Sequence, residues 1–307
     1  MTAHLQTLSD LITHGARRFR VARIGIGHSE DNALGEARSL ALHALHLPAQ
    51  LSVTFAQAKL LSIEIEAVLA LFERRIVERM PAAYLIGTAS FAGLQLRSDA
   101  RALVPRSPIA ELIESGFSPW LKGRDVGRVL DLCTGGGSIA VAMAVHRPDW
   151  QVDAVDLSPV ALSLAAENCE LHGLSARICL IESDLFAALG DEIYNLVVSN
   201  PPYITTAEYH AMPAEYLHEP RLGLESGADG LDATLRILRD APAHLSPDGL
   251  LIVEVGEAER ALVRLLPELP FQWIEFSVGQ MGVFALEASE LRAGLEQVRR
   301  VCDARKL

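Results

Sequence analysis

The second part of the chain alternates between short apolar runs and helix-like segments, and this alternation restricts the possible folds more than any other feature. Apolar runs with the composition of buried strands lie at residues 128–132, 152–155, 176–181, 195–199 and 250–255. Segments of helical character lie between them, at residues 138–146, 159–172 and 231–245. Residues 273–278 and 283–286 surround two glycines and predict a terminal antiparallel hairpin. The alternation is typical of an α/β fold with a mainly parallel sheet and helices on both faces.

The first part of the chain has a different pattern, in which apolar side chains recur at helical spacing. The residues concerned are Leu5, Leu8, Leu11, Ile12 and Phe19, then Leu40, Leu42, Leu45 and Leu47, then Ile65, Val68, Leu69, Phe72 and Ile76. Pro48 and Pro81 follow the second and third stretches, so we predict a small bundle of three amphipathic helices. Strand-forming residues around Gly93 predict a β-hairpin. The chain therefore divides into a helical domain at 1–86, a hairpin linker at 87–105 and a sheet domain at 106–307.

Composition excludes several classes of protein. Half of the 307 residues are hydrophobic (50%), which supplies a sizeable core, but no apolar stretch approaches the roughly 20 residues of a membrane span. The formal net charge of −12 argues against nucleic acid as the main substrate, because phosphate binding requires a basic surface. It suits a basic protein partner, since opposite fields speed encounter, and it suits an ordinary soluble enzyme equally well. The N-terminal residues lack the apolar core of a signal peptide, so we expect a cytoplasmic protein.

Cysteine spacing gives no sign of a metal site. Cys133, Cys169, Cys179 and Cys302 are never paired as in C-x-x-C. We predict reduced thiols and no bound metal.

A glycine-rich turn, Asp131-Leu-Cys-Thr-Gly-Gly-Gly-Ser138, lies where the first strand of the sheet meets its first helix. Glycines at such a junction let the backbone approach a ligand closely. The spacing differs from the dinucleotide fingerprint G-x-G-x-x-G. An aspartate before the turn suits S-adenosylmethionine better, because Asp131 can accept from its ammonium group; a purely structural turn is the alternative. The other candidate contacts are Cys133, Thr134, Gly135, Gly136 and Gly137.

Acidic residues also follow the next two strands. Asp156, followed by Leu157, ends the second strand, where a carboxylate can accept from both ribose hydroxyls. Asp184, followed by Leu185, ends the third strand, where it can accept from an adenine amino group. Each feature is common by itself. Together with the glycine turn, they lie at the carboxyl ends of neighbouring strands and favour a nucleoside ligand.

Asn200-Pro-Pro-Tyr203, directly after the fourth strand, is the most informative motif. An amide nitrogen is a poor nucleophile, because its lone pair is delocalised into the carbonyl. Oxygens that accept both of its N–H bonds favour a pyramidal nitrogen, and Asn200 Oδ1 and the Pro201 carbonyl are the candidates. Pro201 and Pro202 restrict the loop, and the Tyr203 ring offers a face on which a planar group can stack. Such a site acts through orientation and electrostatics rather than acid–base catalysis.

These motifs resemble those of the HemK-type protein glutamine N5-methyltransferases, and the resemblance covers nearly the whole chain. Further segments are similar to the PrmB-like branch, which modifies a glutamine of large-subunit ribosomal protein three: Leu103-Val-Pro-Arg-Ser-Pro-Ile-Ala-Glu-Leu112, Glu215-Tyr-Leu-His-Glu-Pro220, Leu222-Gly-Leu224, Gly227-Ala-Asp-Gly-Leu231 and Val253-Glu-Val-Gly256. The release-factor branch usually has Pro-Arg-Pro-x-Thr-Glu where this chain has Pro105-Arg-Ser-Pro108, and Gly in place of Cys133. The family implies a seven-stranded, Rossmann-like class I methyltransferase sheet with a small N-terminal helical bundle.

The resemblance also implies roles for individual residues. S-adenosylmethionine would contact the turn at residues 133–137, Asp156, and the region of Asp184 and Leu185. Residues 200–203 would hold the target glutamine of a basic ribosomal protein. The release-factor branch often has an aromatic residue in place of Leu185, so stacking on adenine does not follow here. Arg106 is expected to steady the junction between hairpin and sheet domain. A substrate groove or a structural role stays open for Tyr209, Tyr216, His218 and Glu219.

Other functions stay open on the sequence alone. An N6-adenine nucleic-acid methyltransferase would use the same motif, since the exocyclic adenine nitrogen is also planar and conjugated. The acidic charge and the lack of a basic target-reading segment oppose it, so we expect no direct DNA substrate. A release-factor methyltransferase would share every catalytic residue, whereas a non-catalytic scaffold would not need an intact 200–203 motif. The sequence assigns no oligomeric state, no particular glutamine, and no role to the helix-like tail at 291–307.

Overall fold

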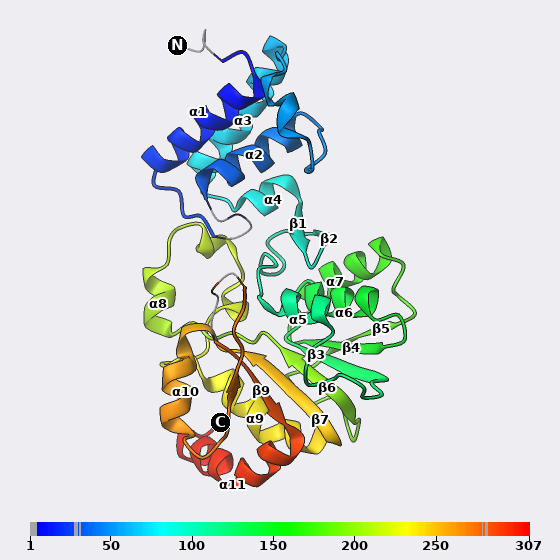
Figure 1. The fold of residues 1–307 in the computed structure, drawn as a ribbon. Helices are drawn as coiled ribbons and strands as arrows, with labels where there is room; N and C mark the ends of the chain where they lie inside the picture. The colour runs from blue at the N-terminus through cyan, green and yellow to red at the C-terminus, as the bar shows by residue number, and fades with distance from the viewer. Residues whose placement is uncertain (1–4, 28–29, 31, 278, 280–281) are drawn as a thin grey trace.

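The computed structural model describes residues 5–27, 30, 32–277, 279 and 282–307. A small group of helices stands apart from a larger α/β body, and a two-stranded hairpin lies between them (Figure 1). This group, the N-terminal bundle, consists of α1 (Leu8–Val21), α2 (Ala33–Ala44), α3 (Ser62–Glu78) and the short α4 (Ala82–Ile86). A 3-10 turn, Val53–Gln57, precedes α3. The three amphipathic helices expected from the apolar periodicity are confirmed.

The long helices of the bundle share one apolar core. α1 begins with a capping box, in which Thr7 Oγ1 accepts from the Asp10 amide and the Asp10 carboxylate accepts from the Thr7 amide. Phe19 of α1 and Phe72 of α3 meet edge to face, with ring centroids 5.4 Å apart. A Cβ on Gly15 would lie 2.5 Å from the Phe72 ring, so this glycine allows the two helices to approach closely.

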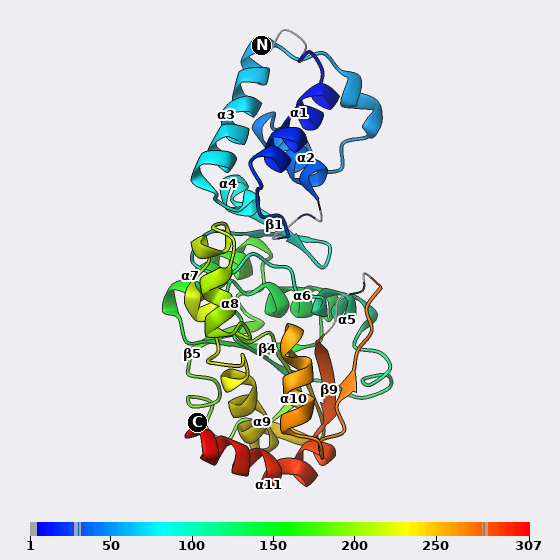
Figure 2. The same ribbon diagram turned by 90° about the vertical axis from the view of Figure 1, so that its left-hand side faces the viewer.

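Charged side chains join the bundle to the α/β body. Arg75 of α3 is fully buried and forms an ion pair with Glu36 of α2. Glu215, from the body, lies 3.6 Å from Arg75 Nη1 and 3.2 Å from Arg79 Nη1. His218 Nε2 lies 2.9 Å from the carbonyl oxygen of the last residue of α3. Because buried charges are tolerated only when paired, these contacts hold the loop around residue 215 beneath the bundle (Figure 2).

The predicted hairpin is confirmed, in a shorter form than the interval 87–105. β1 (Thr88–Phe91) pairs with β2 (Leu94–Arg97) in antiparallel register. Ala92 and Gly93 between them both have positive φ, 45° and 76°, which suits a two-residue turn. Asn168 then binds the end of the hairpin, because its Oδ1 accepts from the Arg97 amide at 2.7 Å. Residues 98–105 are not part of the hairpin and run across to the sheet.

The sheet of the body has seven strands in the order β5-β4-β3-β6-β7-β9-β8. Their bounds are β3 (Arg128–Leu132), β4 (Gln151–Asp156), β5 (Ile178–Glu182), β6 (Tyr194–Ser199), β7 (Leu245–Glu254), β8 (Gln272–Trp273) and β9 (Val283–Glu287). Strands β5, β4, β3, β6 and β7 run parallel to one another, and β9 is antiparallel to both of its neighbours, β7 and β8. The strand order reverses between β3 and β6, and ligands of open α/β sheets bind outside the carboxyl ends of strands at such a point.

Helices cover both faces of this sheet (Figure 1). One face carries α5 (Ile109–Ser115), α6 (Ser138–His146) and α7 (Pro159–Leu171). The other carries α9 (Asp232–His244), α10 (Glu259–Leu265) and α11 (Ala288–Arg305). Successive residues of one strand serve different cores, since Val129 packs on the first face and Leu130 on the second. The predicted α/β class, with a seven-stranded sheet and an N-terminal helical region, is confirmed.

Most predicted elements differ from the observed ones only at their ends. The strand expected at 273–278 is an exception: β8 ends at Trp273, and Val278 lies outside the described residues. Trp273 packs edge to face on Phe284, with centroids 5.5 Å apart. The short helices α5, α8 (Thr206–Ala211) and α10 were not predicted, because two turns are too few for a periodic signal.

In the described part of the chain, no helix combines the length and apolar character needed to cross a membrane. The same residues hold no group of three His, Cys, Asp or Glu side chains placed to bind a metal ion.

Candidate active site

A cavity of about 740 Å³ lies at the carboxyl ends of β3, β4 and β6. Most of the predicted site residues line it. These are Cys133, Thr134, Gly135, Gly136, Asp156, Leu157, Asp184, Leu185, Asn200, Pro201, Pro202 and Tyr203. The structure therefore brings four separate segments of the sequence to one hollow, as their positions after neighbouring parallel strands predicted.

The glycine turn approaches the cavity closely with its backbone. Cys133 and Gly135 have φ of 60° and 56°, a region that glycine enters without strain. A Cβ on Gly136 would lie 3.1 Å from the side chain of Leu164, so bulkier residues would crowd this wall. Gly137 is not on the wall. A Cβ there would lie 3.0 Å from the Cβ of Ala165, so Gly137 serves the packing of α6 on α7, and the ligand contact predicted for it is not supported.

Asp131 has a different place from the one predicted. It is fully buried in β3 and does not line the cavity, so its predicted contact with a ligand ammonium is not supported. Its Oδ2 accepts from Thr134 Oγ1 at 2.5 Å and from the Ala140 amide at 3.0 Å. Burial raises the pKa of the Asp131 carboxyl to about 7, with a smaller contribution from the charge of Asp156. Asp131 thus ties the glycine turn to the first turn of α6.

Asp156 connects β4 to the same turn. Its Oδ2 accepts from the Gly135 amide at 2.8 Å, and its Oδ1 accepts from the Ser158 amide at 2.9 Å. Burial raises the pKa of this carboxyl in spite of both bonds. Each carboxylate oxygen has a second lone pair, so Asp156 can also accept from ligand hydroxyls in the cavity.

Cys133 also lines the cavity, but it is not an activated thiol. Burial, followed by the charge of Asp156, raises the pKa of the Cys133 thiol well above its ordinary value. Because the thiolate is the nucleophilic form, this thiol is expected to be inert.

Asp184 lies at the more open end of the cavity. Its side chain is 48% exposed, and its Oδ2 accepts from Nη2 of Arg236 in α9 at 2.8 Å. Sequence reasoning missed Arg236, which also lines the cavity. The neighbouring Leu185 is buried with φ of 51°, so the backbone turns sharply after β5. Asp184 can accept from a ligand with its other oxygen while it keeps Arg236.

Tyr203 is held by contacts that no local motif indicated. Its hydroxyl donates to Glu254 Oε1 at 2.9 Å, and Ser107 Oγ donates to Glu254 Oε2 at 2.6 Å. Burial, followed by the charge of Glu254, raises the pKa of the Tyr203 phenol well above its ordinary value. A Cβ on Gly256 would lie 2.7 Å from the ring, and a Cβ on Gly230 would lie 2.1 Å from the Tyr203 carbonyl oxygen. Hence two glycines make room for this residue.

The residues that were left open take different places. Glu219 is buried and receives both terminal nitrogens of Arg106, at 2.6 and 2.8 Å, as well as the Val104 amide at 2.8 Å. These contacts fit the junction role expected of Arg106. Tyr216 lines the cavity, and Arg106 Cζ lies 5.6 Å from its ring centroid. Tyr209 is not on the wall; its ring lies under the Arg221 guanidinium, 5.0 Å away.

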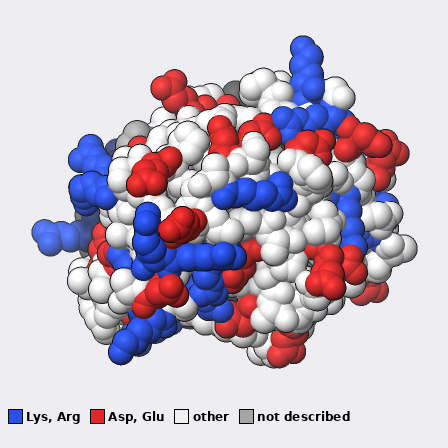
Figure 3. Space-filling view, turned by 90° about the horizontal axis from the view of Figure 1, so that it is seen from below, with Lys and Arg blue, Asp and Glu red and all other residues white. Residues whose placement is uncertain are grey.

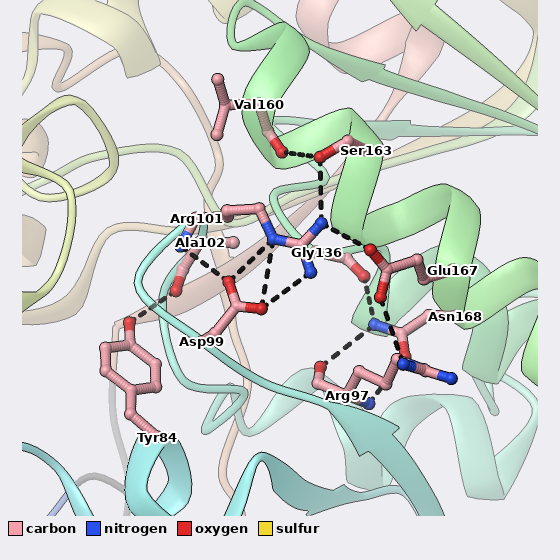
Figure 4. Close-up of polar contacts among 10 residues, drawn as sticks. All are labelled: Tyr84, Arg97, Asp99, Arg101, Ala102, Gly136, Val160, Ser163, Glu167 and Asn168. Atoms are coloured by element: carbon pink, nitrogen blue, oxygen red, sulfur yellow. Dashed lines mark hydrogen bonds and ion pairs between the residues drawn. The ribbon is translucent and has the colours of Figure 1, made fainter.

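The segment after the hairpin forms another wall of the cavity. Figure 4 shows the polar contacts that hold it. Arg101 fixes it, because its guanidinium donates to Asp99 at 2.9 Å and to Glu167 of α7 at 2.6 Å. The Tyr84 hydroxyl from α4 donates to the Ala102 carbonyl at 2.6 Å. Ala102 itself lines the cavity. The N-terminal bundle and α7 therefore both position this wall.

The sequence matches the methyltransferase small domain family over residues 117–227. It is 58% identical to the ribosomal protein uL3 glutamine methyltransferase of Xanthomonas campestris pv. campestris, over 98% of this chain and 97% of that protein. The enzymes of the same name from Xylella fastidiosa and Neisseria gonorrhoeae are 61% and 48% identical; each match covers 94% of this chain, and 92% and 96% of those proteins.

The chain belongs to the ribosomal protein uL3 glutamine methyltransferase family. The catalytic domain of hMettl16, solved in complex with MAT2A 3′UTR hairpin 1, has the same fold, with a TM-score of 0.52, 17% identity and coverage of 80% of this chain and 90% of that one. The resemblance stated from the motifs is confirmed. As a methyltransferase of this family, the protein uses S-adenosylmethionine as methyl donor.

The cavity residues suit S-adenosylmethionine. The turn at Gly135 and Gly136 brings main-chain atoms to the cavity wall, and Asp156 offers acceptors for ribose hydroxyls. Asp184 offers a further acceptor where the cavity opens. The volume of about 740 Å³ also leaves room for a side chain of the methyl acceptor next to Asn200.

Proposed function

We propose that this protein transfers a methyl group to the side-chain amide nitrogen (N5) of a glutamine in ribosomal protein uL3. The position of residues 200–203 carries the proposal: an amide, a proline carbonyl and a ring anchored by Glu254 stand on one wall of the cavity that suits the methyl donor. The names of the relatives support uL3 over a release factor. The acidic net charge of −12 supports a basic protein over a nucleic acid as methyl acceptor.

The residues of the loop act by holding the glutamine amide. S-adenosylmethionine, when bound, supplies an electrophilic methyl group on a cationic sulfur. The amide nitrogen forms the new N–C bond as the S–C bond breaks, S-adenosylhomocysteine leaves, and the nitrogen gives up one proton to water. Asn200 Oδ1 and the Pro201 carbonyl accept the two N–H bonds, which localises the lone pair on nitrogen. Tyr203 packs on the amide plane, so the reacting atoms stay in line.

We assign the binding of the methyl donor to the walls opposite this loop. Cys133, Thr134, Gly135 and Gly136 form the backbone cradle. Asp156, with Leu157 beside it, would accept from the ribose hydroxyls. Asp184 and Leu185 would border the adenine, and Asn200 would face the reacting methyl group as well as the glutamine. Asp131 and Gly137 position this cradle from behind and do not touch the ligand.

We also propose a division of labour along the chain. Residues 1–86 would recognise the protein substrate, 87–105 would link, and 106–307 would carry out the methyl transfer. The contacts of Glu215 and His218 with α3 support this division, because they place the bundle beside the loop that borders the cavity. Ribosomal proteins are made in the cytoplasm, so we place the reaction there.

A methyl-transfer assay with labelled S-adenosylmethionine tests the proposal. Purified uL3, a class-one release factor and a DNA duplex serve as acceptors, and mass spectrometry locates the methyl group. We expect label on one glutamine of uL3. A uL3 variant with that glutamine changed to alanine is the control for the position.

Label on the release factor alone would mean that the amide chemistry is right and that the release factor, not uL3, is the substrate. Label on adenine would overturn the substrate class. No transfer to any acceptor, with S-adenosylmethionine bound, would contradict the catalytic role of residues 200–203.

A further inference from the structure

A second hollow, of about 610 Å³, lies beside the first, and the two share Asp184 and Arg236. Helices α9 and α11 form its walls, and Phe186 and Ala187 after β5 contribute apolar surface. α11 belongs to the tail for which the sequence gave no role. Arginines are the most frequent lining residues: Arg236, Arg239, Arg292 and Arg299. Among the described residues of this wall, the only carboxylates are Asp184 and Asp240.

The two arginines on α9 are paired with carboxylates. Arg239 binds Asp240 through two bonds of 2.7 and 2.8 Å, and Arg236 binds Asp184 at 2.8 Å. Their charges are largely balanced within the hollow. Arg236 and Arg239 therefore supply donors but little net positive potential.

The two arginines on α11 are not paired in this way. Arg292 Nη2 donates to main-chain carbonyls, with the shortest contact to Leu245 at 2.7 Å. Arg299 is exposed, and within the described residues it makes no hydrogen bond or ion pair. The lining of the hollow holds four arginines and two aspartates, a net positive wall in a protein whose formal charge is −12; Glu296 and Asp303 lie within one turn of Arg299 on α11 but do not line it.

The spacing of these charges suits a chain of anions. Arg292 and Arg299 are seven residues apart, which places them on one face of α11, about 10 Å apart along the axis. One strand of a double helix carries a phosphate about every 3.4 Å of helix axis, so this separation spans about three phosphates. Figure 3, which looks onto this end of the molecule, shows Lys and Arg side chains gathered over part of the face, with carboxylates among them.

We propose that the hollow between α9 and α11 binds the phosphodiester backbone of RNA. Arginine is the residue best suited to this, because its planar guanidinium binds phosphate oxygens with two donors at once. Any phosphodiester chain shares this chemistry; the preference for RNA over DNA rests on the proposed ribosomal substrate. The RNA is a docking partner and is not methylated. Its place next to Asp184 and Arg236 sets the RNA beside the methyl-donor cavity.

Fluorescence anisotropy with a labelled RNA duplex of about 20 base pairs tests the proposal on the full chain at 50 to 200 mM KCl. We expect Arg292→Glu/Arg299→Glu to weaken binding at least about tenfold and to reduce the salt slope by about two phosphate contacts. Arg17→Glu/Arg20→Glu on α1 makes the same change in net charge at exposed positions and is the matched control. It should change the affinity less than about threefold. Because Arg299 has no partner to lose, Arg299→Gln reports on the site even if the double variant unfolds.

Equal loss in both double variants would overturn the proposal, since bulk charge would then explain the binding. The proposal would also be overturned if the wild type did not bind the RNA at 50 mM KCl. It would be overturned as well if polyglutamate competed for binding as strongly as unlabelled RNA does. Binding of a DNA duplex alone would overturn the choice of RNA, whereas comparable binding of both duplexes supports a backbone site. Methyl transfer to isolated uL3 by Arg292→Glu/Arg299→Glu should equal that of wild type. If the proposed function is wrong, the methyl-transfer assay will show it, and the anisotropy measurement of RNA binding will not be affected.

Discussion

The hydroxyl of Tyr203 donates to Glu254 Oε1 at 2.9 Å, and this bond orients the ring of the loop on the cavity wall. Glu254 ends β7, the strand next to the one that precedes the loop. Burial raises the pKa of the Glu254 carboxyl, and the hydroxyls of Tyr203 and Ser107 partly oppose that shift. The position of the ring therefore depends on three segments that are distant in the sequence.

Tyr203→Phe should keep the stacking face and lose its anchor. An unpartnered oxygen on buried Glu254 destabilises by about 1–3 kcal/mol, so we expect a lower melting temperature and about a tenfold loss of turnover. Ser107→Ala removes the other donor to Glu254 and serves as the control, with a similar loss of stability and a smaller loss of turnover. Equal loss of turnover in the two variants would argue against a role for ring orientation.

Asn200→Ala should abolish the acceptor for one N–H of the target amide. Removing one preorganised hydrogen-bonding group from a site of this kind lowers turnover about 10²- to 10³-fold. The dissociation constant of S-adenosylmethionine, measured by calorimetry, should change less than about fivefold. Asn195→Ala, in the strand that precedes Asn200 and away from the cavity, controls for folding, because Asn195 Oδ1 accepts from main-chain amides only. Near-normal turnover of Asn200→Ala would refute the assigned role.

Asp156→Asn should weaken binding of the methyl donor. The amide group would place N–H donors against the amides of Gly135 or Ser158, and one charged acceptor for ribose would be lost. We expect the dissociation constant of S-adenosylmethionine to rise about tenfold or more, with a smaller effect on turnover at saturation. Asp153→Asn lies on the same strand, bonded to Tyr194 and Arg128, and should leave that constant unchanged. An unchanged constant in Asp156→Asn would rule out the ribose contact.

Gly230→Ala should displace the loop at residues 200–203. Its φ is 76°, and the added Cβ would lie 2.1 Å from the Tyr203 carbonyl oxygen. Gly173→Ala is a close control, because φ is 68° there and nothing lies within 4 Å of the added Cβ. Both variants bear the backbone strain of about 1 kcal/mol, so the difference between them reports the clash. We expect Gly230→Ala to lose most of its activity and Gly173→Ala to retain it. Comparable activities would show that the loop has room to move.

The raised pKa of Asp131 predicts a pH dependence of stability. The folded state holds this proton up to about pH 7, whereas an unfolded aspartate with its ordinary pKa near 3.8 loses it earlier. The folded state binds more protons between these values, so this group's contribution to the free energy of unfolding falls as pH rises from about 4 to 7, by up to about 1.4 kcal/mol per pH unit. Asp131→Asn removes the titrating group. Denaturation at several pH values should therefore show a flatter profile for the variant; parallel profiles would disprove the raised pKa.

Sequence patterns predicted the elements that build the site. Apolar runs such as residues 195–199 mark parallel strands because both faces of such strands are buried. Asn200, Asp156 and Asp184 follow strands whose carboxyl ends meet at one edge, so their proximity followed from the order of elements. The strand expected at 273–278 was largely wrong: Trp273 pairs with Phe284 of β9 as the last residue of β8, and residues 274–277 have left the strand. Helices as short as α8 were not predicted, because they have too few turns for the apolar residues to show a helical period.

Tertiary structure decided which polar atoms face the cavity. Asp131 and Asp156 look alike in sequence, one in the first strand and one at the end of the second, yet only Asp156 reaches the wall. The reason is that Asp131 packs against α6 and accepts a hydrogen bond from the amide of Ala140 in that helix. Glu254 is 51 residues from Tyr203, and no local pattern links them. The sequence by itself thus determined the fold class and the order of the strands' carboxyl ends, and it supplied the chemistry proposed for residues 200–203, because local periodicity and motif chemistry suffice for these. Only packing over long sequence separations decided which carboxylates line the cavity and which hold the loop in place.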